Sequence, residues 1–158
     1  MEKPLFITLD DTLIFTKSGM KYPVHSKDWI LNIDIIEDIK RLYKKGFKIL
    51  VIDNQDSVEH GYVDIKVFDE KVLEIVQIIE NACGIPANEI CYMFFTGGRD
   101  DYYRLPSPGL AYECALEYEL DLPNSVVIGS SDEDYKFSKN IGARAYNDVN
   151  GKSIDQYK

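Results

Sequence analysis

The sequence contains few of the residues on which many metal-binding and nucleic-acid-binding proteins rely. Of its 158 residues only two are histidines and four are arginines, and its three cysteines lack metal-ligand spacing. The 27 acidic residues outnumber the 18 basic ones, which gives a formal net charge of −9. A surface of that sign repels phosphate backbones, so broad nucleic-acid binding is disfavoured, and a histidine-based metal centre is not expected.

Long hydrophobic runs and a secretory signal are also missing. The longest apolar run, Ile90 to Phe95, has six residues, whereas a membrane-spanning helix needs about 20. Asp10 and Asp11 end the first apolar stretch, so it has no signal-peptide pattern. An odd number of cysteines fits reduced thiols. We therefore expect an intracellular, cytoplasmic protein without a membrane segment.

The segments that are present alternate between short apolar runs and amphipathic stretches, which is typical of a parallel α/β sheet. A turn-rich excursion over 14–30 interrupts the alternation and suggests a hairpin. The pattern predicts an α/β single-domain three-layer sandwich over 1–148, with a mainly parallel central sheet, helices on both faces and a polar C-terminal tail over 149–158. We expect strands at 5–9, 47–52, 89–95, 125–128 and 143–146, and helices from Asn32 and over 69–83, 109–119 and 132–140.

Ligands of such sheets bind beyond the carboxyl ends of the strands, where the strand order reverses. The segments that follow the predicted strands contain an ordered set of motifs. These are Thr8-Leu9-Asp10-Asp11-Thr12-Leu13-Ile14, Asp53-Asn54-Gln55, Tyr103-Arg104-Leu105-Pro106 and Ile128-Gly129-Ser130. In this order and spacing the sequence resembles the haloacid dehalogenase superfamily of phosphatases, which has a Rossmann-like fold. Within it, the sequence is most similar to the 3′-phosphatase branch of polynucleotide kinase/phosphatase.

The resemblance implies catalytic groups that the sequence replaces at several positions. Thr8 stands where the family has a nucleophilic aspartate, and Asp53 stands where it has a Thr or Ser that binds the phosphoryl group. Leu105 replaces a phosphate-binding lysine, and Ser130 replaces an aspartate that binds Mg²⁺. The implied general acid/base is kept as Asp10, and a further acidic position is kept as Asp134.

These departures lead to three hypotheses. The leading one is a catalytically degenerate phosphatase-like protein, a binding or structural component of a larger assembly, with protein partners and no cofactor. The alternative is an active Mg²⁺-dependent phosphatase on polynucleotide 3′-phosphates or small phosphate esters. The third is a sensor that binds a cationic or neutral molecule in the acidic pocket. The oligomeric state stays open.

If the protein is active, the resemblance assigns roles to seven residues. The catalytic ones are Asp10, Asp53 and Thr8, with Asp53 as a nucleophile or metal ligand relocated to the second strand. The substrate-binding ones are Thr12, Asn54 and Arg104, and the metal ligands are Asp10 and Asp134. Structural roles are the alternative: Asp10 and Thr12 hold a turn, Asn54 and Gln55 bridge loops, and Asp134 belongs to the acidic first turn of a helix.

Overall fold

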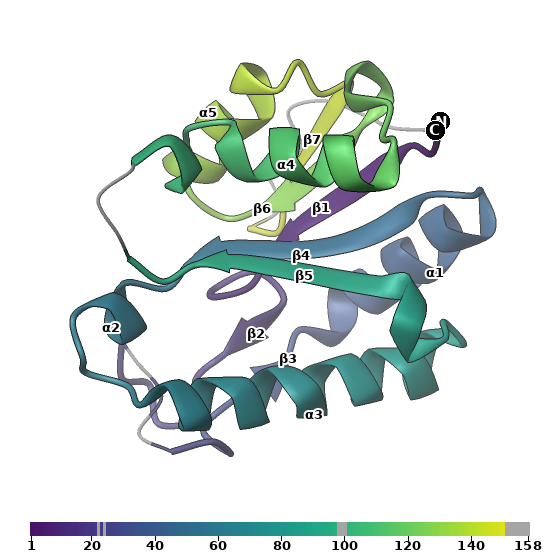
Figure 1. The fold of residues 1–158 in the computed structure, drawn as a ribbon. Helices are drawn as coiled ribbons and strands as arrows, with labels where there is room; N and C mark the ends of the chain where they lie inside the picture. The colour runs from purple at the N-terminus through teal and green to yellow at the C-terminus, as the bar shows by residue number, and fades with distance from the viewer. Residues whose placement is uncertain (22, 24, 98–100, 151–158) are drawn as a thin grey trace.

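The computed structural model describes residues 1–21, 23, 25–97 and 101–150 (Figure 1). A five-stranded sheet forms its centre, in the order β5-β4-β1-β6-β7, and every strand pair in it is parallel. The predicted parallel sheet is thus confirmed. In chain order, β4 and β5 are added on one side of β1, and β6 and β7 are then added on its other side. The strand order therefore reverses beside β1. The strands are β1 (Pro4–Thr8), β4 (Lys48–Asn54), β5 (Ile90–Phe95), β6 (Val126–Gly129) and β7 (Ala145–Asp148).

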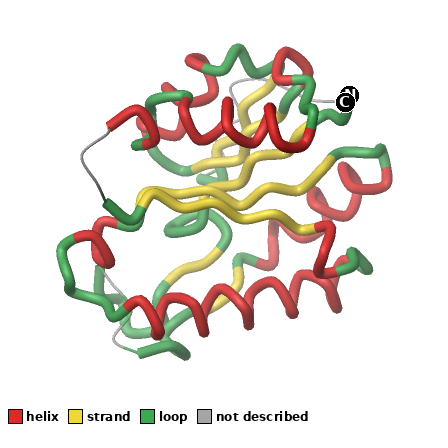
Figure 2. Tube along the Cα trace, viewed as in Figure 1, coloured by secondary structure: helices red, strands yellow, loops and turns green. Residues whose placement is uncertain are grey.

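Helices cover both faces of the sheet, so the predicted three-layer arrangement is confirmed (Figures 1 and 2). Each face has its own cluster of buried apolar side chains, one centred on Ile7, Ile49 and Ile75 and the other on Phe6 and Phe137. On one face lie α1 (Ile36–Lys44) and α3 (Ile65–Cys83), and on the other lie α4 (Gly109–Tyr118) and α5 (Asp132–Asn140).

The excursion between β1 and α1 forms a small hairpin, as the sequence suggests. Its strands β2 (Ile14–Phe15) and β3 (Ile30–Leu31) pair antiparallel and lie on the same side of the sheet as α3 (Figure 1). The buried Trp29 indole donates to the carbonyl of Ser26, and an ion pair from Lys27 to Glu74 joins the excursion to α3. The hairpin therefore borders the carboxyl end of β1.

Several boundaries differ from the predictions for local reasons. α3 begins at Ile65 and not at 69, because the Asp64 carboxylate accepts from the Lys66 backbone N–H and caps the extra turn. Asn32 caps a 3₁₀ turn that leads into α1. Before α4, the Ser107 hydroxyl donates to the carbonyl of Tyr102. A short helix, α2 (Asp56–Glu59), and 3₁₀ turns at Ile33–Ile35, Ala87–Glu89, Asp101–Tyr103 and Leu122–Asn124 complete the described elements.

Within the described ranges, no helix has the length and apolar character that crossing a membrane requires. The three cysteines are free thiols, two of them buried, as expected. Most of the predicted polar tail, residues 151–158, lies outside the described residues.

Candidate active site

The carboxyl ends of β1, β4 and β6 meet at the point where the strand order reverses, and each brings an acidic residue. Asp10 follows β1, Asp53 lies near the end of β4, and Asp134 lies in the first turn of α5, just after β6. The Asp10 and Asp53 residues are partly buried, and Asp134 is buried. The structure thus brings together all three carboxylates that the sequence singles out.

Asp53 crosses from its own strand to the end of β1. Its Oδ2 accepts hydrogen bonds from the backbone N–H groups of Leu9 and Asp10, at 3.1 and 2.6 Å. Its Oδ1 accepts from the N–H of Asn54 at 2.9 Å. Successive backbone N–H groups that converge on one point form an anion-binding nest, and here the nest at the end of β1 holds the Asp53 carboxylate.

Hydroxyl groups fill the space between Asp134 and β1. The buried Thr8 hydroxyl donates to Asp134 Oδ2 at 2.8 Å and lies 2.7 Å from the Thr12 hydroxyl. Thr12 in turn donates to the Ser130 hydroxyl at 2.9 Å. Asp134 also completes a capping box with Ser131 at the start of α5, so the expected acidic helix turn is present. Asp134 therefore serves both as a helix cap and as the acceptor for Thr8.

Asp10 has partners on the opposite side of the site. Gln55 donates to its Oδ2 at 3.0 Å, and the Lys71 Nζ lies 3.9 Å from its Oδ1. The Lys71 side chain, on α3, is only 1% exposed. Our sequence reasoning missed Lys71, although a signal exists: it is a basic residue within the apolar stripe of an amphipathic helix, three positions after Phe68.

Burial raises the pKa of all three carboxyl groups above the ordinary value of 3.8. The increase is greatest at Asp53, because the negative charge of Asp10 adds to the effect of burial. At Asp10, the positive charge of Lys71 opposes the effect of burial and lowers the pKa. Since Asp10 and Asp53 repel one another when both are ionised, the pair retains a proton at a pH where isolated carboxyl groups have lost theirs. Such a pair offers one proton donor and one ionised carboxylate.

Asn54 bridges two loops, as the structural reading of the sequence expects. Its side-chain amide exchanges two hydrogen bonds of 2.9 Å with the backbone of Leu105. Leu105 itself is 2% exposed and belongs to the apolar cluster under α4 and α5. Leu105 therefore packs into the apolar core at the position where the family has a phosphate-binding lysine.

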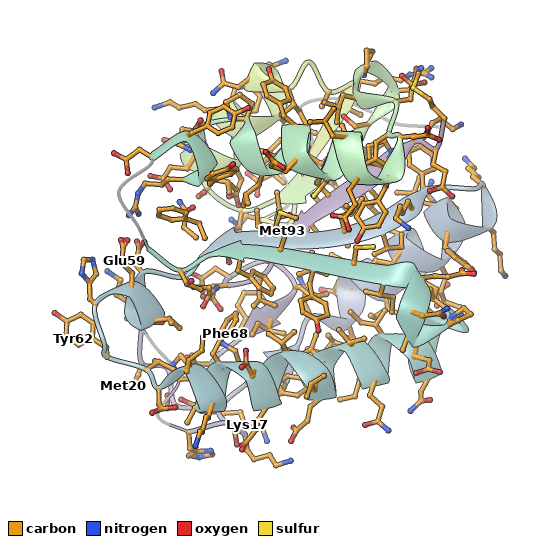
Figure 3. All side chains as sticks on the ribbon, viewed as in Figure 1. Lys17, Met20, Glu59, Tyr62, Phe68 and Met93 are labelled. Carbon is orange, nitrogen blue, oxygen red and sulfur yellow. The ribbon has the colours of Figure 1, made fainter. Side chains whose placement is uncertain are left out.

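Arg104 lies in a cluster of acidic side chains and away from Asp10. Its guanidinium pairs with Asp56 at 2.9 Å, with Glu59 and with Asp101 at 3.4 Å, and it stacks on the Phe95 ring with 4.7 Å to the centroid. Figure 3 shows Glu59 on α2, at the end of the sheet that carries the site. These contacts join the loop after β5 to α2. The predicted substrate-binding role of Arg104 stays a prediction.

The family resemblance implies Mg²⁺, so we asked whether the residues fit this ion. Within the described ranges no three His, Cys, Asp or Glu side chains are grouped as metal ligands. Asp134 Oδ2 already accepts from the Thr8 hydroxyl and from the backbone N–H groups of Ser130 and Ser131. Octahedral Mg²⁺ needs well-placed carboxylate oxygens, and this arrangement does not fit it. Binding by Asp10 and Asp134 stays a prediction, and no step below depends on a metal.

A comparison with protein families decides the classification of this fold and site. A family model described as Polynucleotide kinase 3 phosphatase matches residues 5–147, a range that contains every motif discussed above. The chain belongs to this family. The resemblance seen in the sequence is thus confirmed for almost the whole length of the chain.

Individual relatives align with most of the sequence of this member of the polynucleotide kinase 3 phosphatase family. An uncharacterized 20.8 kDa protein of Autographa californica nuclear polyhedrosis virus is 28% identical over 153 residues, which cover 87% of the chain and 79% of the viral protein. A "Probable D-glycero-D-manno-heptose-1,7-bisphosphate 7-phosphatase" of Thermoplasma volcanium is 28% identical over 143 residues, with coverages of 88% and 93%. The crystal structure of the D,D-heptose 1,7-bisphosphate phosphatase from B. bronchiseptica, complexed with magnesium and phosphate, has the same fold. It superimposes with a TM-score of 0.75 at 19% identity and covers 91% of this chain and 78% of that one.

These comparisons correct our leading interpretation of the sequence. The expectation of a catalytically degenerate binding or structural component, which rests on Thr8, Leu105 and Ser130, is contradicted by relatives that are named as phosphatases. The physical reason for the error is that it treats each motif position in isolation. The folded site receives the Asp53 carboxylate from β4 at the end of β1, which the alternative hypothesis had singled out, and a lysine from α3, which the motifs do not reveal.

Proposed function

We propose that the protein hydrolyses a phosphate monoester, with Asp53 as the nucleophile and Asp10 as the general acid and base. One observation carries the proposal: the Asp53 carboxylate reaches the backbone N–H groups of Leu9 and Asp10, at the end of β1. The family resemblance assigns the nucleophile to that end of the sheet. A relocated carboxylate therefore reaches the required place from the neighbouring strand.

In the first step, an ionised Asp53 oxygen attacks phosphorus and the bond from phosphorus to the leaving oxygen breaks. The carboxyl group of Asp10 gives its proton to the leaving alkoxide, and an aspartyl phosphate remains on Asp53. The Leu9 and Asp10 N–H groups, which bind the carboxylate in the resting site, are placed to donate to phosphoryl oxygens as charge moves onto them.

In the second step, water attacks phosphorus and gives a proton to the Asp10 carboxylate. The bond between phosphorus and Asp53 breaks, which releases inorganic phosphate and restores Asp53. The pKa values of both carboxyl groups are raised, and more so at Asp53, so the proton of the pair rests on Asp53 and must pass to Asp10 before Asp53 can attack.

Small phosphorylated molecules are the favoured substrates within this proposal. Relatives over most of the chain are named for a sugar bisphosphate. The net charge of −9 disfavours a long polyanion, and acidic partners surround Arg104. Polynucleotide 3′-phosphates are the second candidate, because the matching family carries that activity in its description.

Phosphate release by the purified full chain tests the proposal. The substrates are sugar mono- and bisphosphates and a 3′-phosphorylated oligonucleotide, each with Mg²⁺ and with EDTA. We expect turnover by the wild type and a loss of about 100-fold or more in Asp10→Asn and Asp53→Asn. The exposed residue Asp69 provides the matched control Asp69→Asn, which should keep full activity.

Two results would contradict the proposal. The first is a wild-type rate no higher than that of Asp10→Asn on every substrate. The second concerns the nucleophile: acid-quenched enzyme should carry a hydroxylamine-labile phosphoryl group in the wild type but not in Asp53→Asn. If Asp53→Asn instead carries a hydroxylamine-stable phosphoryl group that disappears in Thr8→Val, the nucleophile is Thr8 and the assignment is wrong.

A further inference from the structure

The site has more negative charge than the described contacts balance. Asp10, Asp53 and Asp134 approach one another, and the charges of Asp10 and Asp134 both act on Asp53. The incoming phosphate adds further negative charge. The family resemblance assigns a neutralising lysine to the loop after β5, but Leu105 stands there, buried among Phe6, Leu50 and Leu110. A phosphatase with this site needs a cation from another element.

α3 provides a cation from the opposite face of the sheet. Within the described ranges, Lys71 is the basic side chain that lies within 4.0 Å of an Asp10 carboxylate oxygen. Its Nζ also lies 5.1 Å from the centre of the Phe68 ring, which Figure 3 shows between α3 and the sheet. Burial of an ammonium group lowers the stability of the fold unless a negative charge lies nearby. The Asp10 carboxylate provides that charge for Lys71.

The geometry leaves Lys71 with unused capacity to bind an oxygen. Its distance of 3.9 Å to Asp10 exceeds that of a hydrogen bond, while an ammonium group has three N–H donors. Lys71 also borders a narrow cavity of about 10 Å³, roughly the room one water molecule needs. The other residues that line this cavity include Asp10, Asp11, Asp28 and a second lysine, the exposed Lys21, so Lys71 is the buried one of its two cations.

We infer that Lys71 is the cation of this active site, and that it binds an anionic oxygen of the phosphate ester next to Asp10. The inference rests on the proposed function, because it assigns the phosphate-binding charge of that same site. Lys71 on α3 thus takes the role that the family resemblance gives to the lysine of the loop after β5. The two positions lie on opposite faces of the sheet. Lys71 thereby offsets the charge that Asp53 and the substrate bring together.

Substitution of Lys71 tests the inference with two measurements, kcat/KM and the inhibition constant of inorganic phosphate. In Lys71→Met we expect kcat/KM to fall at least tenfold and the inhibition constant to rise at least tenfold. Lys27→Met is the matched control, because Lys27 also pairs with an acidic residue, Glu74 on α3, but is exposed. It should change neither value more than twofold.

A purely structural ion pair gives a different result: the melting temperature of Lys71→Met falls, but the inhibition constant of phosphate stays within twofold of the wild type. That outcome overturns the inference and leaves the proposed function intact. If Lys71→Met does not fold, the same two measurements are made on Lys71→Gln, and the same criteria apply. If the wild type turns over no substrate, the proposed function fails, and calorimetric titration with inorganic phosphate still tests Lys71. Binding that is lost in the variant supports its role, and absence of binding to the wild type refutes it.

Discussion

The Asp53 carboxylate lies over the backbone of Asp10, with its Oδ2 atom 2.6 Å from the Asp10 amide nitrogen. The two carboxyl groups are electrostatically linked, because the negative charge of Asp10 adds to burial in raising the pKa of Asp53. Rates and stability should therefore depend on pH in a range where ordinary carboxyl groups are already fully ionised.

The first prediction concerns the acid limb of the pH–rate profile. Only ionised Asp53 attacks phosphorus, and its pKa is raised well above 3.8 by burial and by the charge of Asp10. A raised pKa means that ionisation requires a higher pH, so kcat/KM should increase with pH through a midpoint clearly above 3.8. Profiles of the wild type and of Asp69→Asn should coincide, whereas Lys71→Met should move the basic limb, which reports the general acid Asp10, to higher pH, because Lys71 lowers the pKa of Asp10. A midpoint at or below 3.8 would contradict the assignment.

The second prediction concerns stability. Since the pKa of Asp53 is raised in the folded state, the folded protein binds more protons than the unfolded chain at pH values between 3.8 and the folded pKa. The free energy of unfolding must then fall as pH rises through this window. Asn in place of Asp53 removes that contribution but keeps an oxygen for the Leu9 and Asp10 amides. Denaturant titrations from pH 4 to 8 should show a smaller loss for Asp53→Asn than for the wild type, and parallel curves would refute the raised pKa.

The third prediction concerns Gly129, the last residue of β6. A Cβ atom at this position would lie 2.5 Å from the Asp134 Cβ and 2.8 Å from its Oδ2, so Gly129→Ala must displace the acceptor of the Thr8 hydroxyl. We expect a loss of about 1–3 kcal/mol in unfolding free energy together with reduced kcat. Gly142→Ala is the control, because Gly142 has φ +69 and open space. It should lose about 1–2 kcal/mol through backbone strain and keep kcat.

The fourth prediction concerns Arg104, which joins the loop after β5 to α2. Arg104→Met removes the ion pairs with Asp56 and Glu59 and should lower the unfolding free energy by about 1–2 kcal/mol. Arg104→Lys keeps the charge but not the forked geometry, so an intermediate loss is expected. Because the acidic partners already occupy the guanidinium, KM should change less than threefold. A large rise in KM without loss of stability would instead support the substrate-binding role.

The parallel sheet was predictable because its strands have a local sequence pattern, whereas the strand order is seen only in the structure. Buried parallel strands appear as continuous apolar runs, such as 49–52 within β4, and the ends of such strands locate a site without knowledge of side-chain contacts. A loop-bridging role of Asn54 was one of the two interpretations of the sequence, but its partner, the backbone of Leu105, is seen only in the structure. Helix boundaries were less certain, since the cap at Asp64 depends on one side-chain hydrogen bond.

The chemistry of the site was harder to predict because it depends on contacts between distant segments. The motif positions of Thr8 and Leu105 suggest lost function when they are read alone. Asp53 reaches across 43 positions of sequence to Asp10, and Lys71 approaches from a helix that contains none of the motifs. Hydrophobic periodicity places a residue on a helix face, but it does not show that a buried lysine points at a carboxylate.

The fifth prediction tests whether Thr8 and Asp53 have exchanged roles. Thr8 pairs in register with Ile52, directly before Asp53, so the two positions lie at adjacent strand ends. Asp53→Thr removes the proposed nucleophile and should lower kcat/KM by about 100-fold or more. Thr8→Asp alone adds a further buried carboxylate beside Asp134 and should lower stability. The double variant returns one carboxylate to the end of β1 and should exceed Asp53→Thr at least tenfold in kcat/KM. If the effects of the two substitutions simply multiply, the positions act independently and the exchange is refuted.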